Sequence, residues 1–374
     1  MSDFQDDYLP FFTEDSRFNV TDYTSSRYRK LPPEDRERWV QEIYDWYRNV
    51  HGFPYPTYEP DELHYIAWKL RNMRDSELEF EDTLPSTILG TEICNSFFPN
   101  MYETKQILPA FRANGKGRGY RLSPMETFQS EKHFKKVIRL CFEYKPNAAP
   151  PQVRGAISLV NGTASKFNPL VVRCLVDRYT PAGGTYYDFA CGWGARLLGT
   201  KSSRKGIRYV GVDPNTKTHD NLKRLNDWLS ETYKYDPSTV DIRKMGSEDF
   251  CPEELIGQVD FAFSSPPYFN LEHYSNEASQ SYNRFPSVGQ WLHGYLFRTF
   301  DNIRKLLRPG GVFALNMVNY QGAEFVQPAL EYVESIGFVK VATHLMPIYQ
   351  RVGPSNKDGE TFKNEEIYVY RRPL

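Results

Sequence analysis

The sequence predicts an α/β fold, a doubly wound and mostly parallel sheet that follows a mainly helical N-terminal domain. From about residue 153 onward, short apolar strands alternate with helical segments, the order of a doubly wound sheet. Two of these strands end in unusual turns, G-W-G and S-P-P-Y, at the edge where open α/β sheets bind ligands. The first 150 residues instead show helical periodicity. We therefore expect a helical domain over 1–150 and an α/β domain over 151–374.

The N-terminal domain is expected to contain helices over residues 33–50 and 61–73, with Trp39, Ile43 and Trp46 on one face. A basic, glycine-rich stretch follows at residues 111–121. Cations on such a flexible stretch suit a phosphate backbone, although a solvated charged surface is the alternative interpretation. The candidate nucleic-acid contacts are Arg112, Lys116, Arg118 and Arg121.

The α/β domain is expected to begin with a helix over 170–179, for which Asn168 serves as N-cap and Pro169 as the first residue. A strand from residue 185 then leads into a G-x-G turn and a helix over 195–203. Gly192 and Gly194 allow positive φ and let the backbone approach a ligand closely.

The second strand, 208–213, ends in Asp213, a carboxylate that can accept both hydroxyls of a ribose. A nicotinamide-binding fingerprint would need a third glycine, where this chain has Leu197. A helix over 216–232 and a third strand over 239–245 follow. Glu248 and Asp249, after that strand, suit hydrogen bonds to an adenine amine or belong to a polar loop.

The fourth strand, 259–263, ends in Ser264, Ser265, Pro266, Pro267 and Tyr268. Two prolines cannot continue a central strand, so the chain turns out at the carboxyl end of the sheet. The turn presents hydroxyl and carbonyl acceptors beside an aromatic ring, a combination that suits a planar heterocycle with an amino group.

The remaining elements complete the sheet. A helix over 288–307 stops at R-P-G-G, and a buried strand at 312–317 precedes a helix over 328–336. Strands at 338–343 and 367–370 are consistent with a terminal hairpin.

These motifs resemble those of class I S-adenosylmethionine-dependent methyltransferases. The stretch D-F-A-C-G-W-G resembles their motif I, and Asp213 the acidic end of motif II. S-P-P-Y resembles the (D/N/S)-P-P-(Y/F/W) signature of DNA amino-methyltransferases, which modify cytosine N4 or adenine N6. The resemblance covers roughly residues 155–374. It implies a Rossmann-like, seven-stranded, mostly parallel sheet whose last strand is antiparallel and lies between the fifth and the sixth.

The resemblance also implies roles for particular residues, including a loose match to motif X at Phe167, Asn168 and Pro169. It implies that the cofactor, S-adenosylmethionine, is bound by Phe167, Asn168, Pro169, Asp188, Phe189, Ala190, Gly192, Trp193, Gly194, Asp213, Pro214, Glu248, Asp249 and Ser264. The implied catalytic turn is Ser265, Pro266, Pro267 and Tyr268.

The implied substrate is an exocyclic amino group of a DNA base, flipped out of the stack against Tyr268. A serine in the first motif position favours N4-cytosine over N6-adenine. An RNA or protein-amide methyltransferase is an alternative, because related enzymes use N-P-P-Y at the same strand end. A catalytically silent subunit that binds the cofactor or nucleic acid is another. The polar segment 270–290, with its tyrosines, is expected to close over the flipped base.

Composition limits the other possibilities. A net charge of −1 argues against a uniformly basic nucleic-acid binder, so any such contact needs a local patch. Five scattered cysteines without a C-x-x-C pair point to a reducing compartment and no zinc site. No apolar run is long enough for a membrane span and the N-terminus is acidic. These features predict a cytoplasmic protein without a metal or a membrane partner, and they identify no protein partner.

Overall fold

The computed structural model describes residues 18–108, 119–162, 164, 166–320, 324–349 and 362–374. The chain divides into two compact units. The first, here called the helical unit, comprises Met1–Thr57, Tyr102–Gln106 and Tyr120–Ala164. The second, here called the α/β unit, comprises Tyr58–Met101, Ile107–Gly119 and Ser165–Leu374.

The helical unit is built on aromatic packing. Tyr47 is fully buried, donates its hydroxyl to Ala148 O at 2.8 Å, and meets the ring of Phe134 edge-on at 5.4 Å. Tyr28 stacks on Phe142 with ring centroids 4.1 Å apart. The α-helices of this unit are α1 (Ser25–Tyr28), α2 (Pro33–Trp46, extended by a π-helical turn over Tyr47–His51), α7 (Pro124–Gln129), α8 (Glu131–Tyr144) and α9 (Pro150–Asn161).

The α/β unit contains a seven-stranded sheet of order β4-β3-β2-β5-β7-β9-β8. β9 pairs antiparallel with both β7 and β8, whereas the pairs from β4 to β7 are parallel. The strands are β2 (Thr185–Asp188), β3 (Arg208–Val212), β4 (Thr239–Arg243), β5 (Val259–Ser264), β7 (Leu307–Asn316), β8 (Val339–Tyr349) and β9 (Phe362–Arg371). This is the predicted order, with the last strand inserted between the fifth and the sixth.

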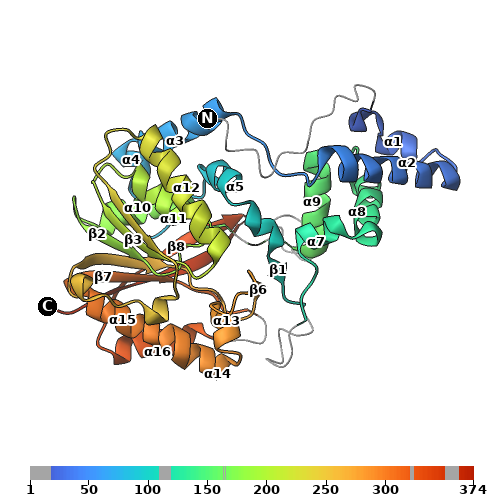
Figure 1. Ribbon diagram of the computed structural model, residues 1–374. Helices are drawn as coiled ribbons and strands as arrows, with labels where there is room; N and C mark the ends of the chain where they lie inside the picture. The colour runs from blue at the N-terminus through green and yellow to red at the C-terminus, as the bar shows by residue number, and fades with distance from the viewer. Residues whose placement is uncertain (1–17, 109–118, 163, 165, 321–323, 350–361) are drawn as a thin grey trace. The chain divides into compact units, whose positions relative to one another are not determined.

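Helices cover both faces of this sheet, with α10 to α12 on one side and α14 to α16 on the other (Figure 1). Their apolar faces complete a doubly wound core. The helices of the unit are α3 (Pro60–Arg71), α4 (Asp75–Leu78), α5 (Thr91–Phe97), α10 (Pro169–Tyr179), α11 (Ala195–Ser202), α12 (Thr216–Thr232), α13 (Ser281–Arg284), α14 (Val288–Trp291), α15 (Arg298–Leu306) and α16 (Val326–Ser335). A π-helical segment, Leu292–Phe297, joins α14 to α15.

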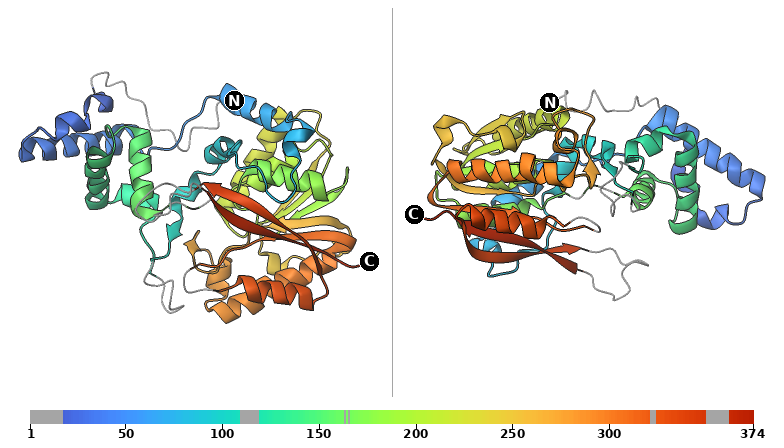
Figure 2. Two further views of the ribbon diagram at one scale, coloured as in Figure 1. Left: turned by 180° about the vertical axis from the view of Figure 1, so that it is seen from behind. Right: turned by 90° about the horizontal axis from the view of Figure 1, so that it is seen from below.

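The terminal hairpin is confirmed, and it is longer than predicted (Figure 2). The helical segment that precedes β7 ends with α15 at Leu306, as R-P-G-G predicts, but β7 already begins at Leu307. The pairing of β7 with β5 jumps from Val259↔Leu307 to Phe261↔Val312. Arg308–Gly311 therefore forms a bulge in a strand rather than a loop before one.

The division of the chain differs from the predicted boundary near residue 150. Residues 58–101 belong to the α/β unit, because α3 and α5 complete the packing of its helical layer. Tyr233, after α12, donates to Ala67 O of α3 at 2.8 Å, and Phe97 of α5 meets the ring of Trp228 at 5.5 Å. Sequence periodicity identifies these helices but not the layer on which they pack.

Candidate functional site

The S-P-P-Y turn leaves β5 at the carboxyl edge of the sheet, as predicted. Ser264 is the last residue of the strand, is fully buried, and donates its hydroxyl to Ala190 O at 3.1 Å. This bond ties the turn to the G-W-G loop after β2. Phe269, directly after the turn, adopts φ 44°, a left-handed conformation that is strained for a bulky residue. Strain of this kind gathers at functional sites when the surrounding packing enforces it.

Ser265, Tyr268 and Asn316 form a hydrogen-bonded chain. The hydroxyls of Ser265 and Tyr268 lie 2.9 Å apart, and Tyr268 donates to Asn316 Oδ1 at 3.4 Å. Burial, reinforced by the nearby carboxylate of Glu365, raises the pKa of the Tyr268 hydroxyl, so it stays a donor. Because Tyr268 donates to Asn316, Ser265 donates to Tyr268. The Ser265 oxygen keeps a lone pair for a further donor.

The G-W-G loop brings backbone to the same edge. Gly194 is the N-cap of α11 at φ 75°. A Cβ there would lie 2.6 Å from both Leu225 Cδ2 and Phe98 Cε2, so only glycine fits without a shift. Trp193, partly exposed in the loop, meets the ring of Tyr274 at 5.9 Å. Phe189 is buried in the sheet core and is therefore a packing residue.

Asp213 lies directly after β3, beside this loop. Its carboxylate accepts from Gly192 N at 3.0 Å and from Asn215 N at 2.9 Å. Burial raises its pKa to about 7, even though both backbone bonds act in the opposite direction. The acid therefore stands at the predicted strand end, where it fixes the loop to the start of α12.

Asp188, at the end of β2, is bonded entirely to the protein. Its oxygens accept from Arg196 Nε at 3.0 and 3.1 Å, and from the Tyr209 hydroxyl at 2.8 Å. Ala190 N donates to it as well, at 3.3 Å. The predicted cofactor carboxylate is thus the partner of a buried arginine.

The segment before α10 has the structure of a helix start. Asn168 Oδ1 accepts from Leu170 N at 2.9 Å, and Pro169 is the first residue of the helix. The N-cap interpretation is confirmed. Phe167 meets the ring of Phe263 in β5 at 5.5 Å and lies under the guanidinium of Arg196. Phe167 therefore lies next to the strand end that carries S-P-P-Y.

Glu248 and Asp249 form a 3-10 turn after β4. Arg284 of α13 bonds both carboxylates, at 2.6 Å to Asp249 and more closely to Glu248. Burial raises the pKa of Glu248, and its Oε2 has no hydrogen-bond partner among the residues that the structure describes. One buried acceptor is therefore left at this strand end.

The segment 270–290, here called the strap, lies against the loops after β2, β3 and β4. Tyr274 contacts Trp193, and Ser279 donates to Pro214 O at 3.2 Å. Glu277 accepts from Thr216 N at 3.1 Å and from the Thr216 hydroxyl at 2.9 Å. With the Arg284 pairs described above, the strap contacts all three loops that the sequence assigns to the cofactor. Closure of the strap over a flipped base stays a prediction.

The predicted nucleic-acid contacts are placed only in part. Arg112, Lys116 and Arg118 lie outside the described residues. Arg121, in the helical unit, donates to Val160 O at 2.9 Å, a contact within that unit. It therefore helps to fix the backbone of the helical unit.

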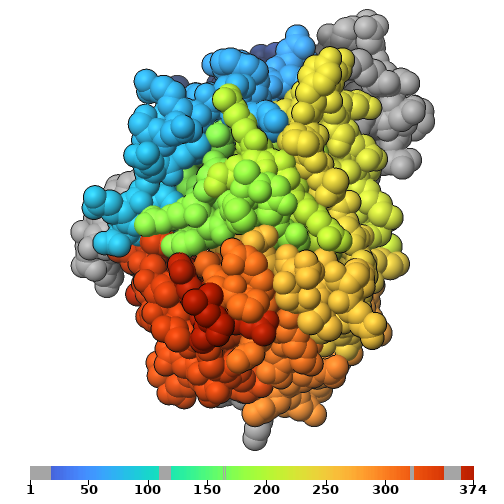
Figure 3. Space-filling model, turned by 90° about the vertical axis from the view of Figure 1, so that its left-hand side faces the viewer, coloured from blue at the N-terminus to red at the C-terminus, as the bar shows by residue number. Residues whose placement is uncertain are grey.

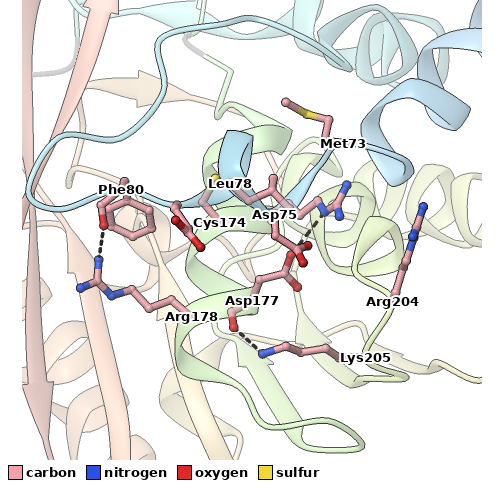
Figure 4. Close-up of a pocket in the computed structure, with 11 residues that line it drawn as sticks. Met73, Asp75, Leu78, Phe80, Cys174, Asp177, Arg178, Arg204 and Lys205 are labelled. Atoms are coloured by element: carbon pink, nitrogen blue, oxygen red, sulfur yellow. Dashed lines mark hydrogen bonds and ion pairs between the residues drawn. The ribbon is translucent and has the colours of Figure 1, made fainter.

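A separate surface pocket of about 540 Å³ lies beside α10 (Figures 3 and 4). Lys205, on its wall, precedes β3, so the pocket lies near the amino end of a strand. Arg178 donates to Phe80 O at 2.8 Å, and Lys205 donates to Thr180 O at 2.9 Å. Both cations therefore donate to backbone carbonyl oxygens of the protein, which indicates a structural role. None of the predicted site residues lines this pocket.

The residues that the structure describes hold no group of three or more His, Cys, Asp or Glu side chains arranged for a metal ion. None of their helices is both long and apolar enough to cross a membrane.

No protein-family model matches the chain, and no curated protein matches its sequence. Several solved structures are similar at low identity. A SAM-dependent O-methyltransferase from Thermotoga maritima is 12% identical over 56% of this chain and 68% of its own, with a TM-score of 0.36. A methyltransferase from Pyrococcus furiosus is 14% identical over 56% and 84%, with a TM-score of 0.33. A phosphoethanolamine N-methyltransferase from Haemonchus contortus, solved with S-adenosylmethionine, is 13% identical over 54% and 52%, with a TM-score of 0.34.

Because these identities and scores are low, the assignment of the fold rests on the strand order. A seven-stranded sheet with an antiparallel last strand between the fifth and sixth is the Rossmann-like class I methyltransferase fold.

The structure gathers the residues predicted at the ends of β2, β3, β4 and β5 along one edge of the sheet. It also adds three that sequence analysis missed: Arg196, Asn316 and Glu277. The sequence pattern that could have identified Arg196 is a cation in the first turn of an otherwise apolar helix. The pattern that could have identified Asn316 is a polar residue at the end of a buried strand.

Proposed function

We propose that this protein is an S-adenosylmethionine-dependent methyltransferase that acts on an exocyclic amino group of a DNA base. The observation that carries the proposal is the bond between Ser264 and Ala190 O, which joins the S-P-P-Y turn to the G-W-G loop. A turn suited to an amine and a loop suited to the cofactor thereby share one edge. The fold is one that class I methyltransferases use.

The residues along this edge fit S-adenosylmethionine. Gly194 lets α11 begin in close contact with Phe98 and Leu225, where a side chain would collide. Asp213 offers a carboxylate for ribose hydroxyls, and Glu248 keeps a buried acceptor for the adenine amine. When bound, the cofactor supplies an electrophilic methyl group on a sulfonium.

Residues of the S-P-P-Y turn orient the exocyclic amino group of the base. The lone pair of the amino nitrogen is delocalised into the ring, which makes the nitrogen a poor nucleophile. Ser265 donates to Tyr268 and so presents its oxygen to one amino proton, while Pro266 O accepts the other. Tyr268 provides a face for stacking, and Asn316 holds its hydroxyl. Positioning of this kind supplies much of the rate.

The preferred base is cytosine, methylated at N4, ahead of adenine at N6. This preference rests on serine in the first position of the motif. In a duplex, the base leaves the stack before it reaches the turn.

The direct test uses labelled S-adenosylmethionine with duplex DNA, single-stranded DNA, tRNA and protein acceptors, followed by mass analysis of the nucleosides. We expect N4-methylcytosine in DNA. Label only in tRNA or protein would contradict the DNA assignment, and a methyl group on a ring carbon would contradict the amine mechanism. No transfer to any acceptor would favour a silent subunit.

Substitutions in the turn test the mechanism. Ser265→Ala should lower turnover more than cofactor affinity, and Tyr268→Ala should cost roughly 1–3 kcal/mol of base stacking. The exposed Ser230 and Tyr235 provide matched controls, because Ser230→Ala and Tyr235→Ala remove the same groups away from the site. Full activity in both turn variants would refute the assigned roles.

The DNA contact can be tested through salt dependence. Replacing Arg112, Lys116, Arg118 and Arg121 by Ala should weaken DNA binding and flatten its dependence on salt, with cofactor affinity unchanged. Unchanged salt slopes would place the phosphate contact elsewhere.

A further inference from the structure

Helix α3 exposes two large aromatic side chains on the surface of the α/β unit. Tyr65 is 61% exposed and Trp68 is 59% exposed, and their rings lie nearly parallel, at 18°, with centroids 6.1 Å apart. Folded proteins bury most of the surface of an average tryptophan, and exposed apolar patches mark interaction sites. This pair of side chains, here called the aromatic ridge, takes no part in the proposed function.

The packing of α3 explains why the aromatic ridge faces outward. Ile66, Ala67 and Leu70 are buried on the opposite face of the helix, where α3 packs on α11 and on the end of α12 (Figure 1). The ring of His64 stacks on Trp228 of α12 at 5.1 Å. Because these contacts fix one face of α3, the other face stays at the surface.

The aromatic ridge lies away from the candidate site. Helix α12 begins after β3, at the carboxyl edge of the sheet, so its last turn lies near the amino ends of the strands. That end contacts α3, since Thr232 Oγ1 lies 3.3 Å from His64 Nδ1 and Asp236 pairs with Arg71 at 3.4 Å. A partner bound on the aromatic ridge therefore leaves the S-P-P-Y turn and the G-W-G loop open.

Charges of opposite sign flank the aromatic ridge along α3. Asp61 and Glu62 lie in the first turn of the helix, and Lys69 and Arg71 lie in the last. The helix dipole favours these signs, but it does not account for the exposed rings. Glu62, Tyr65 and Lys69 follow one another at spacings of three and four, so they share the exposed face. Acid, aromatic and base in that order are complementary to an antiparallel copy of the same face.

We propose that α3 forms a homodimer interface, in which it packs antiparallel against α3 of a second copy of this chain. The twofold axis passes near the middle of the helix, so that the two aromatic ridges meet and Glu62 pairs with Lys69 of the partner subunit. Such an interface is isologous and closes at two copies. The inference goes beyond the proposed function, because it holds for any substrate of the candidate site.

The area of the aromatic ridge sets the strength of this dimer. Two rings that are about 60% exposed offer roughly 250 Å² per copy, or roughly 500 Å² for both copies. A stable interface of standard size buries about 1,200–2,000 Å² in total. The ridge supplies about a third of that area, and flanking side chains such as the stem of Lys69 supply the rest. We therefore expect a weak dimer, with a Kd on the order of 10–100 µM.

Sedimentation velocity of the full chain, from about 1 µM to about 1 mM, covers this range of Kd. The unmodified protein should pass from monomer to dimer. Trp68→Ala should weaken association by at least about 10-fold, because an aromatic side chain at the centre of an interface carries much of its energy. Tyr144→Ala, which removes a side chain that is 66% exposed in the helical unit, is the control and should have no effect.

Charge reversal distinguishes a second copy from any other partner. Glu62→Lys and Lys69→Glu should each weaken self-association by about 10-fold, because each places like charges across the interface. A mixture of the two variants should associate as tightly as the unmodified protein, since every facing pair is then attractive, and high salt should reduce both effects.

A protein that stays monomeric at about 1 mM, or a dimer that none of the α3 substitutions weakens, would overturn the proposal. Failure of the mixed variants to associate would overturn the antiparallel arrangement. A monomer whose DNA binding is weakened by Trp68→Ala would assign the aromatic ridge to nucleic acid instead and would equally overturn the proposal.

Discussion

Replacing Asp213 by Asn should change how stability depends on pH. Burial raises the pKa of this carboxyl from 3.8 to about 7, with the charge of Asp188 adding to the effect and that of Arg196 opposing it. The folded protein therefore holds a proton that the unfolded chain has already lost. Between about pH 4 and about pH 7, the free energy of unfolding falls as pH rises, by at most about 1.4 kcal/mol per pH unit from this group. The full difference has an upper limit of about 4 kcal/mol.

Urea unfolding of the ligand-free protein and of Asp213→Asn, at several pH values from about 5 to about 8, measures this slope. Other titrating groups cancel in the comparison. The unmodified protein should lose stability relative to the variant up to about pH 7 and run parallel to it above that. Cofactor affinity should rise over the same range, because an ionised carboxylate accepts more strongly from ribose hydroxyls. Parallel stability curves throughout would refute the reasoning.

Three further substitutions test other parts of the site. Gly194→Ala should destabilise the fold by about 2–4 kcal/mol, because it combines left-handed backbone strain with a steric clash. Gly257 has φ 69° and open space around it, so Gly257→Ala should cost only about 1–2 kcal/mol. Urea unfolding compares the two variants. Glu277→Gln removes a negative charge from the start of α12 at Thr216 and should loosen the strap. Stopped-flow measurements should then show faster cofactor association and dissociation. Unchanged rates would mean that the strap does not gate the site. Asn316→Leu should lower turnover by about 5- to 10-fold, the worth of one hydrogen bond, with little effect on cofactor affinity, and equal losses in both would show a general disturbance of the fold.

The sequence determined the architecture of the α/β unit because its signals are local. Strand periodicity, helix caps and turn residues each act over a few neighbours, so the hairpin, the stop at Leu306 and the N-cap Asn168 could all be predicted. The ends of parallel strands share one edge of a sheet, and Asp213 and Ser265 could therefore be assigned to one site.

Only the tertiary structure decided which groups remain available to a ligand. Asp188 and Arg196 lie eight residues apart, and nothing in the sequence shows that they form a buried ion pair, in which the carboxylate is already bonded to the protein. The same holds for Asn316, which reaches Tyr268 across 48 residues, and for Glu277, which reaches Thr216 across 61. The assignment of α3 and α5 to the α/β unit was decided in the same way. Such pairings depend on how distant segments pack, and burial then sets the cost of every polar group left unpaired.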